Sequence, residues 1–183
     1  MKSGIFKTLF VALLLAFSPV AASAQSADLD SLFEQLADPA TQDWQKVESQ
    51  IWLQWSLSGS SAMDLLLIRG RRAMQAGDLQ GAIEHLTALT ENAPNFAEGW
   101  NARATAYFQA GLFGPSIQDI QRTLALNPRH FGALSGLGMI FEQMDRPKDA
   151  LKAYQAAVAI HPKRTNLIDA VKRLEVAVGD TEL

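Results

Sequence analysis

Apolar and polar positions alternate along the chain in a pattern that repeats every 34 residues between positions 63 and 164. Each period holds two runs in which apolar residues recur at helical spacing, and short segments rich in Gly, Asp or Pro separate the runs. The pattern predicts six helices and an all-α fold. Their expected ranges are 63–75, 79–92, 97–109, 115–126, 131–143 and 147–160.

The three periods superpose without an insertion when they begin at Met63, Ala97 and Phe131. Their thirty-second place is always Pro, and large and small residues keep their places elsewhere. The equivalent sets are Pro94, Pro128 and Pro162; Leu66, Trp100 and Leu134; Gly70, Ala104 and Gly138; Ala73, Tyr107 and Phe141; Ala82, Ser116 and Ala150; Leu86, Ile120 and Tyr154. Helices of this length are marginal alone, so the units must stack to bury their apolar faces.

A 34-residue period with this order of large, small and Pro residues resembles the tetratricopeptide repeat (TPR) family, whose pattern is W-x2-L-G-x2-Y…A-x3-F…P. The resemblance implies an α-solenoid of three helix pairs, with the first helix of each pair lining a concave side. The repeats would occupy 63–96, 97–130 and 131–164. An N-terminal helical cap of two helices would cover 25–62, and a closing helix and tail would cover 165–183.

Residues 1–24 have the features of a secretory signal peptide. Lys2 and Lys7 lie near the start, an apolar run extends from 5 to 17, and small residues end at Ala24. A membrane anchor is the alternative, but 13 helical residues span roughly 20 Å, against about 30 Å of hydrocarbon. We therefore expect cleavage after Ala24 and no stable membrane insertion afterwards. The junction is similar to that of exported Gram-negative proteins, which implies the periplasm.

Between the leader and the repeats, the sequence predicts a polar linker over 25–28, a short helix ending before Asp38, and a helix over 39–57. The second helix carries Trp44, Trp52 and Trp55, and such a face must dock on something. Extending the repeat register backward predicts that this helix packs as a degenerate second helix before repeat one. The three Trp residues then form part of a cap, and a partner-binding face is the alternative.

Composition argues against several functions. The chain has no Cys, which excludes disulfides and thiolate chemistry, and its net charge of −3 becomes −5 without Lys2 and Lys7. An acidic domain is unsuited to nucleic acid. The three His residues are too far apart for a ligand pair, and no catalytic motif is present. We therefore expect no metal, no cofactor and no enzymatic activity.

The resemblance places the second, fifth, ninth, twelfth and thirteenth residues of each unit on the concave side. These positions mix amides, hydroxyls, Met, Phe and Arg, which suits an extended peptide. The predicted groove residues are Arg71, Asn101, Thr105, Phe108, Gln109, Ser135 and Met139. The Lys, Asn and Arg positions with which chaperone-binding members hold a carboxylate are occupied instead by Leu67, Arg71, Ala102, Gly132 and Gly136.

Two further features concern packing. Arg103 and Asp119 match the Arg and Asp of a known variant of the repeat, and we expect a structural ion pair between them. In the first unit His85 takes the Asp place, which leaves Arg69 to Glu84 or to a ligand. Gly132 and Gly136 weaken one helix, and either admit a bulky neighbour or leave space for a partner's backbone.

These observations predict a non-enzymatic adaptor or scaffold of the bacterial envelope that binds a protein or peptide in the concave TPR groove. A self-assembling structural subunit is the alternative, and a membrane-anchored scaffold replaces both if the leader is retained. The sequence leaves open whether the chain forms a homo-oligomer.

Overall fold

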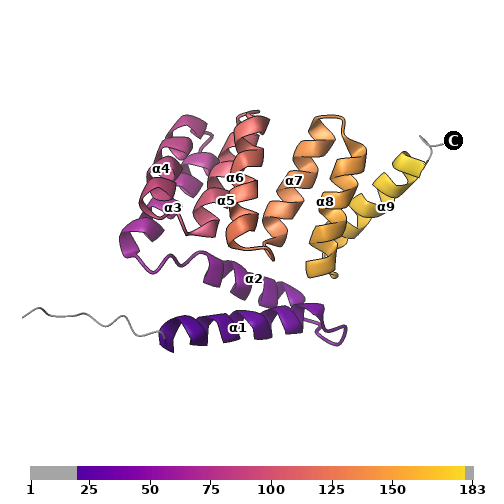
Figure 1. The fold of residues 1–183 in the computed structure, drawn as a ribbon, viewed down its shortest axis with the longest axis horizontal. Helices are drawn as coiled ribbons and strands as arrows, with labels where there is room; N and C mark the ends of the chain where they lie inside the picture. The colour runs from indigo at the N-terminus through magenta and orange to yellow at the C-terminus, as the bar shows by residue number, and fades with distance from the viewer. Residues whose placement is uncertain (1–19, 180–183) are drawn as a thin grey trace, which may run out of the picture.

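The computed structural model describes residues 20–179, with side chains from Asp28 onward, and this part of the chain is all-α (Figure 1). The prediction of an all-α fold is confirmed. The described helices are α1 (Val20–Ala37), α2 (Trp44–Trp55), α3 (Ser61–Gln75), α4 (Leu79–Asn92), α5 (Ala97–Gln109), α6 (Phe113–Leu126), α7 (Phe131–Gln143), α8 (Pro147–Ile160) and α9 (Thr165–Gly179). Helices α3 to α8 agree with the six predicted ranges, within two residues at each end.

Each helix pair closes around one small residue on its first helix. A Cβ added to Gly70 would lie 2.5 Å from Leu86 Cγ, and one added to Gly138 would lie 2.6 Å from Tyr154 Cε1. In the middle pair the hydroxyl of Ser116 donates to the carbonyl oxygen of Ala104 at 2.7 Å. The small and large places of the repeat are therefore the contact points of paired helices.

The turn inside each pair needs one residue in the left-handed region, at the fifteenth place of the unit. Gly77 (φ 77°) and Gly111 (φ 73°) supply it in the first two repeats, and Asp145 (φ 54°) supplies it in the third. Asp is among the few residues with a side chain that tolerate this conformation. The third repeat thus keeps the same turn without glycine.

The solenoid curves with its first helices on the inner side. Helix α3 contacts α5 and α5 contacts α7, whereas no comparable contact joins α4 to α6 or α6 to α8. Since neighbouring first helices lie closer together than neighbouring second helices, α3, α5 and α7 line the concave face. Helix α9 packs on α8 through Leu167 and Leu174, which are buried, and closes the last repeat.

The N-terminal helices differ from the prediction in their boundaries. Helix α1 already begins at Val20, so residues 25–28 are helical and the predicted linker is wrong. The Ala residues around this segment favour helix. Helix α2 begins at Trp44 rather than at 39, because Asp38 is engaged in a turn in which its Oδ1 accepts from the Ala40 N–H at 2.9 Å. Residues 1–19 of the predicted leader lie outside the described residues.

The position of α2 also differs from the prediction. Helices α1 and α2 form a hairpin that lies across the edge of the solenoid where consecutive repeats are joined, as Figure 1 shows below α3 to α8. Trp55 lies 5.1 Å from Phe131, at the start of α7, and Trp52 lies 5.6 Å from it, measured between ring centroids. Helix α2 therefore docks on the third repeat and not, as expected, on α3 as a preceding second helix.

In this arrangement the three Trp side chains of α2 pack against other residues of the same chain. The hairpin core contains Leu32, Phe33, Leu36, Val47, Ile51, Trp55 and Phe131, with Leu29, Trp44, Trp52 and Ile160 packed around it. The aromatic face is thus a docking surface between hairpin and solenoid. No helix within residues 20–179 has both the length and the apolar character to cross a bilayer.

The hairpin contact makes a prediction for Gly132. A Cβ at this position would lie 2.5 Å from Trp52 Cη2, and the indole already packs against the rings of Trp55 and Phe131. We expect Gly132→Ala to lower the free energy of unfolding by about 1–2 kcal/mol, because overpacking outweighs the gain in helix propensity. Urea denaturation measures the change.

Gly136→Ala is the matched control for this prediction. Its added Cβ would meet only Ile120 Cδ1, at 3.8 Å, so we expect a gain of about 0.5–1 kcal/mol from helix propensity. Equal effects of the two substitutions would contradict the docking of Trp52 on Gly132.

Candidate functional site

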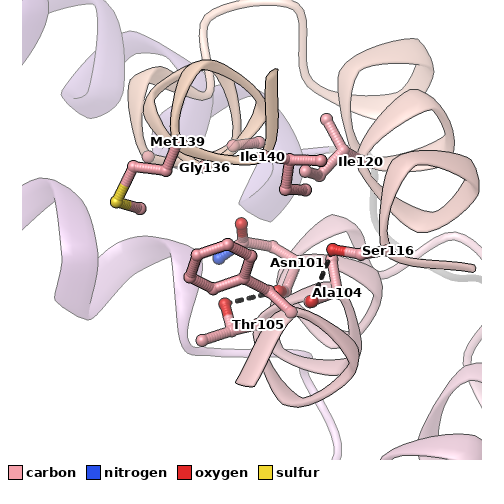
Figure 2. Close-up of a pocket in the computed structure, with 11 residues that line it drawn as sticks. Asn101, Ala104, Thr105, Ser116, Ile120, Gly136, Met139 and Ile140 are labelled. Carbon is pink, nitrogen blue, oxygen red and sulfur yellow. Dashed lines mark hydrogen bonds between the residues drawn. The ribbon is translucent and has the colours of Figure 1, made fainter. Parts of the chain in front are cut away.

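A small, mostly apolar pocket opens on the concave face between α5 and α7. Its volume is about 80 Å³. Figure 2 shows the side chains of α5 and α7 facing one another across it, with Met139 at the rim. The lining residues are Asn101, Ala104, Thr105, Phe108, Ser116, Ile120, Gly132, Ala133, Gly136, Met139 and Ile140.

The missing side chain of Gly136 keeps this pocket open. Because a Cβ there would touch nothing closer than 3.8 Å, close packing does not require glycine at this position. Gly132, one turn earlier, instead admits the ring of Trp52. The two explanations that the sequence left open thus apply to different residues: Gly132 accommodates a bulky neighbour, and Gly136 leaves space in the groove.

The structure brings four of the seven predicted groove residues to the pocket: Asn101, Thr105, Phe108 and Met139. Met139 is 43% exposed, so an apolar group is available at the rim. The Thr105 hydroxyl donates to the backbone oxygen of Asn101 at 3.0 Å. Gln109 and Ser135 do not line the pocket, although Gln109 is exposed at the end of α5.

Arg71, the remaining predicted groove residue, is bound within the chain. Its Nη2 donates to Glu98 Oε1 at 2.5 Å and its Nη1 donates to Ser56 Oγ at 3.1 Å. The same buried carboxylate accepts from Asn101 Nδ2 at 3.0 Å and lies 2.9 Å from His130 Nε2. Arg71 therefore supplies no free charge to a partner.

Sequence reasoning placed Glu98 on the concave side but missed its burial and the role of His130. No local signal relates the two residues, which are 32 positions apart. His130 occupies a repeat junction, where the rings of Trp52 and Trp55 from the hairpin lie against it. The repeat register relates Glu98 to His130, the last residue of the same unit, but it does not relate Glu98 to Arg71 of the preceding unit.

A second carboxylate near the groove is also paired. Glu142 Oε1 accepts from the Tyr154 hydroxyl at 2.8 Å, and Glu142 Oε2 accepts from Arg173 of α9 at 2.6 Å. Burial, followed by the hydrogen bond to Glu142, raises the pKa of Tyr154, so this hydroxyl stays protonated and keeps donating. The ionic groups beside the pocket thus satisfy one another.

Arg103 and Asp119 form a bidentate pair between α5 and α6, apart from the pocket lining. Nε donates to Oδ2 at 2.7 Å and Nη2 donates to Oδ1 at 2.9 Å, and Nη1 reaches Thr87 Oγ1 of the preceding repeat at 3.2 Å. The hydrogen bond to Asp119 raises the pKa of Arg103. The pair thus braces α5 to α6 and to α4.

Among the described residues, the first repeat has no ion pair equivalent to Arg103–Asp119. Arg69 is exposed and has no partner among the described residues, while Glu84 accepts from Gln80 at 2.9 Å instead. Within residues 20–179, no three His, Asp or Glu side chains gather as metal ligands.

Stacked helix pairs with a groove along their first helices define a helical-repeat solenoid. The tetratricopeptide repeat model matches residues 68–118 and 116–165, more than half of the chain. The chain belongs to the tetratricopeptide repeat family, and the predicted TPR solenoid is confirmed. Repeats of this family are protein-interaction modules.

Two curated relatives agree with this membership. A TPR repeat-containing protein of Rhizobium etli is 34% identical over 143 residues, which are 78% of this chain and 70% of the relative. The small glutamine-rich tetratricopeptide repeat-containing protein 2 of Mycosarcoma maydis is 32% identical over 97 residues, which are 53% of this chain and 28% of that protein.

Solved structures show the same fold at low identity. The first TPR domain of Spaghetti, bound to the HSP90 peptide SRMEEVD, has a TM-score of 0.61 and 21% identity, and the match covers 64% of this chain and 93% of that one. A crystal structure of MamA has a TM-score of 0.60 and 19% identity, over 92% of this chain and 87% of MamA.

The ion pair between Arg103 and Asp119 leads to a testable prediction. Asp119 is buried, so Asp119→Ala should lower the free energy of unfolding by about 3 kcal/mol, because Arg103 is left without its acceptor in a largely desolvated site. The double variant Arg103→Leu, Asp119→Leu should recover most of this loss, since it removes both charges. Chemical denaturation of the single and double variants measures both. Equal losses in the two would contradict a buried, coupled pair.

Proposed function

We propose that this chain is a non-enzymatic adaptor of the bacterial cell envelope that binds an extended protein segment in its concave groove. The observation that carries the proposal is the pocket between α5 and α7, which Gly136 holds open at a cost in helix propensity of about 1 kcal/mol. Because packing within the chain does not require glycine at this position, the space that it leaves can receive a side chain from a partner.

The size and lining of the pocket indicate what it accepts. A volume of about 80 Å³ is enough for one aliphatic side chain, and Ala104, Phe108 and Ile140 provide apolar walls. Burying such a side chain contributes about 1.5–3 kcal/mol. Ordering a flexible segment consumes part of this gain, so the binding should be in the micromolar range.

The charges of the groove argue for an uncharged segment. Arg71 and Glu142 face it but are bound to Glu98 and to Tyr154 and Arg173. The exposed amides of Gln109 and Gln143 at the ends of α5 and α7 can hydrogen bond to a peptide backbone. A Spaghetti domain of this fold binds a peptide with an acidic end, whereas Arg71 in the groove of this chain is already paired with Glu98.

The groove predicts a loss of binding in two variants. Gly136→Ala places a methyl group in the pocket and Phe108→Ala removes a wall, and each should weaken binding of a partner about tenfold, from loss of one buried apolar contact. Crosslinking pull-down from an envelope extract identifies partners. Titration calorimetry with a purified partner then gives the affinities.

Gln121→Ala, an exposed change on α6, is the control and should bind like wild type. Because Gly136→Ala should not destabilise the fold, its loss of binding cannot be attributed to unfolding. Partners held equally well by wild type, Gly136→Ala and Phe108→Ala would rule out the groove as their site.

Export is the second part of the proposal, and the leader pattern of residues 1–24 supports it. Cleavage after Ala24 would shorten α1 to residues 25–37 and keep its buried Leu32, Phe33 and Leu36. We expect the cellular protein to begin at Gln25 and to fractionate with the periplasm. Mass spectrometry of the N-terminus and cell fractionation test the two expectations. Recovery of full-length protein with the inner membrane would contradict export and would instead indicate a membrane-anchored scaffold.

A further inference from the structure

One side of each first helix receives the second helix of the preceding repeat. On α5, a Cβ added to Gly99 would lie 3.2 Å from Leu89 Cδ2 of α4, and Arg103 Nη1 donates to Thr87 Oγ1 of α4 at 3.2 Å. Buried clusters join this side of α5 to Leu89 and the same side of α7 to Ile120 of α6. The side takes the third, sixth, seventh and tenth places of a unit. The residues there are Gly99, Ala102, Arg103 and Ala106 on α5, and Ala133, Gly136, Leu137 and Ile140 on α7.

The same four places of the first repeat are uncovered. They hold Leu65, Ile68, Arg69 and Arg72 of α3, which we call the α3 face, and all four side chains are exposed. The hairpin, which precedes α3 in the chain, docks on Phe131 of the third repeat instead. A face that receives a helix twice within this molecule is therefore open at its first occurrence.

The α3 face does not have the composition of a solvated end. Terminal faces of repeat proteins are usually polar. Helix α9 at the other end follows this rule, since its exposed side chains include Asp169, Lys172 and Glu175. The α3 face instead exposes two large aliphatic side chains, Leu65 and Ile68, one turn apart. Adjacent exposed aliphatic residues, at places that are buried in the other repeats, indicate a docking surface.

The α3 face reverses the sizes found where repeats stack inside the chain. There, a small residue of the first helix, such as Gly99, meets a large residue of the preceding second helix, such as Leu89. On α3 the third and sixth places carry Leu65 and Ile68. A helix that packs on them at the density of a protein interior must therefore present small side chains.

Arg69 and Arg72 give one end of the α3 face a positive charge, although the chain has a net charge of −3. Neither side chain forms an ion pair among the described residues. In the second repeat the equivalent Arg103 is held by Asp119, whereas the first repeat has His85 at the Asp place. A helix that covers Arg69 must supply the acceptor itself, because a desolvated guanidinium without a carboxylate is costly.

The carboxylate of α3 itself does not neutralise this charge. Asp64 lies at the start of α3, and its Oδ1 accepts from the N–H of Ser58 at 2.8 Å and from the Ser58 hydroxyl at 2.6 Å. The α3 face is thus apolar toward the start of α3 and cationic toward its end. A second copy of this chain does not fit it face to face, because four arginines would be buried without an acceptor.

We propose that the α3 face docks an acidic helix of another protein, which extends the solenoid at its N-terminal end. Small side chains of that helix pack on Leu65 and Ile68, and its carboxylates accept from Arg69 and Arg72. The α3 face lies apart from the pocket between α5 and α7, so this site does not depend on what the groove binds.

A photo-crosslinker in the α3 face identifies the occupant. The full chain carries Ile68→p-benzoylphenylalanine, the cells that produce it are irradiated, and mass spectrometry identifies the crosslinked peptide. We expect a segment of another protein with helical periodicity, in which Ala, Gly or Ser residues form one side and Asp or Glu residues lie beside them. The control carries the same crosslinker at Gln121, an exposed position of α6. An adduct with a second copy of this chain, an adduct with lipid, or labelling no stronger than at Gln121 would overturn the proposal.

A synthetic peptide with the sequence of the crosslinked segment then tests the charges. The double variant Arg69→Glu, Arg72→Glu should bind it at least tenfold more weakly, because two ion pairs become two repulsions. Replacing the peptide's carboxylates by Lys should restore binding to this variant. The control Lys152→Glu, Lys172→Glu changes the net charge equally, at exposed positions of α8 and α9, and should bind like wild type. Equal weakening by the two double variants, or no recovery with the Lys peptide, would contradict the docking of an acidic helix.

Ile68→Ser tests the apolar half of the α3 face and should weaken binding of the same peptide about tenfold. Because Ile68, Arg69 and Arg72 are exposed, all these variants should keep the wild-type melting temperature, so a loss of binding cannot be attributed to unfolding. Gly136→Ala, which changes the concave pocket, should leave both the crosslink and the peptide affinity unchanged. Loss of binding in Gly136→Ala would assign the segment to the groove, and wild-type affinity in Ile68→Ser would equally exclude the α3 face.

Discussion

The close approach of paired helices at one small residue per repeat is the constraint on which this structure depends. At Gly70 and Gly138 a methyl group would already collide with the side chains of Leu86 and Tyr154, so the second helix of each pair packs a large side chain directly against the backbone of the first helix. Short helices gain little stability alone. Close pairing leaves apolar side chains to stack on the next unit, as Leu86 and Leu89 of α4 do on Ala102 and Ala106 of α5.

The α1–α2 hairpin does not stack on α3 as a preceding repeat would. Its position leaves one side of α3 exposed and covers the turn edge of the solenoid. The side of α3 that would receive a preceding repeat keeps Leu65 and Ile68 exposed at 44% and 43%. By contrast, Ala133 of α7, which occupies the same place in its repeat as Leu65, is buried. Helix α2 lies instead along the turn edge, where His130, His161 and Phe131 receive its aromatic rings. Gly132 permits this docking by leaving room for Trp52.

The groove and the hairpin joint share one buried ionic network. Glu98 is 3% exposed, yet it contacts Arg71 from the first repeat, Asn101 of the pocket lining, and His130 under the hairpin. Such a carboxylate is tolerated in the interior only because each partner is in place. Any movement of the hairpin therefore affects the same side chain that holds the pocket's Asn101.

The sequence alone determined the repeated part of the molecule: its period, its helix pairs and the family to which it belongs. This succeeded because pairing and stacking depend on residues a fixed distance apart, such as Gly70 and Leu86, so local spacing carries the information. Groove positions such as Asn101, Phe108 and Met139 followed from the same register. Only the tertiary structure decided where the hairpin docks, which of Gly132 and Gly136 opens a pocket, and that Glu98 and His130 meet. The hairpin contacts join positions of the chain that no period relates, and packing geometry alone selects them.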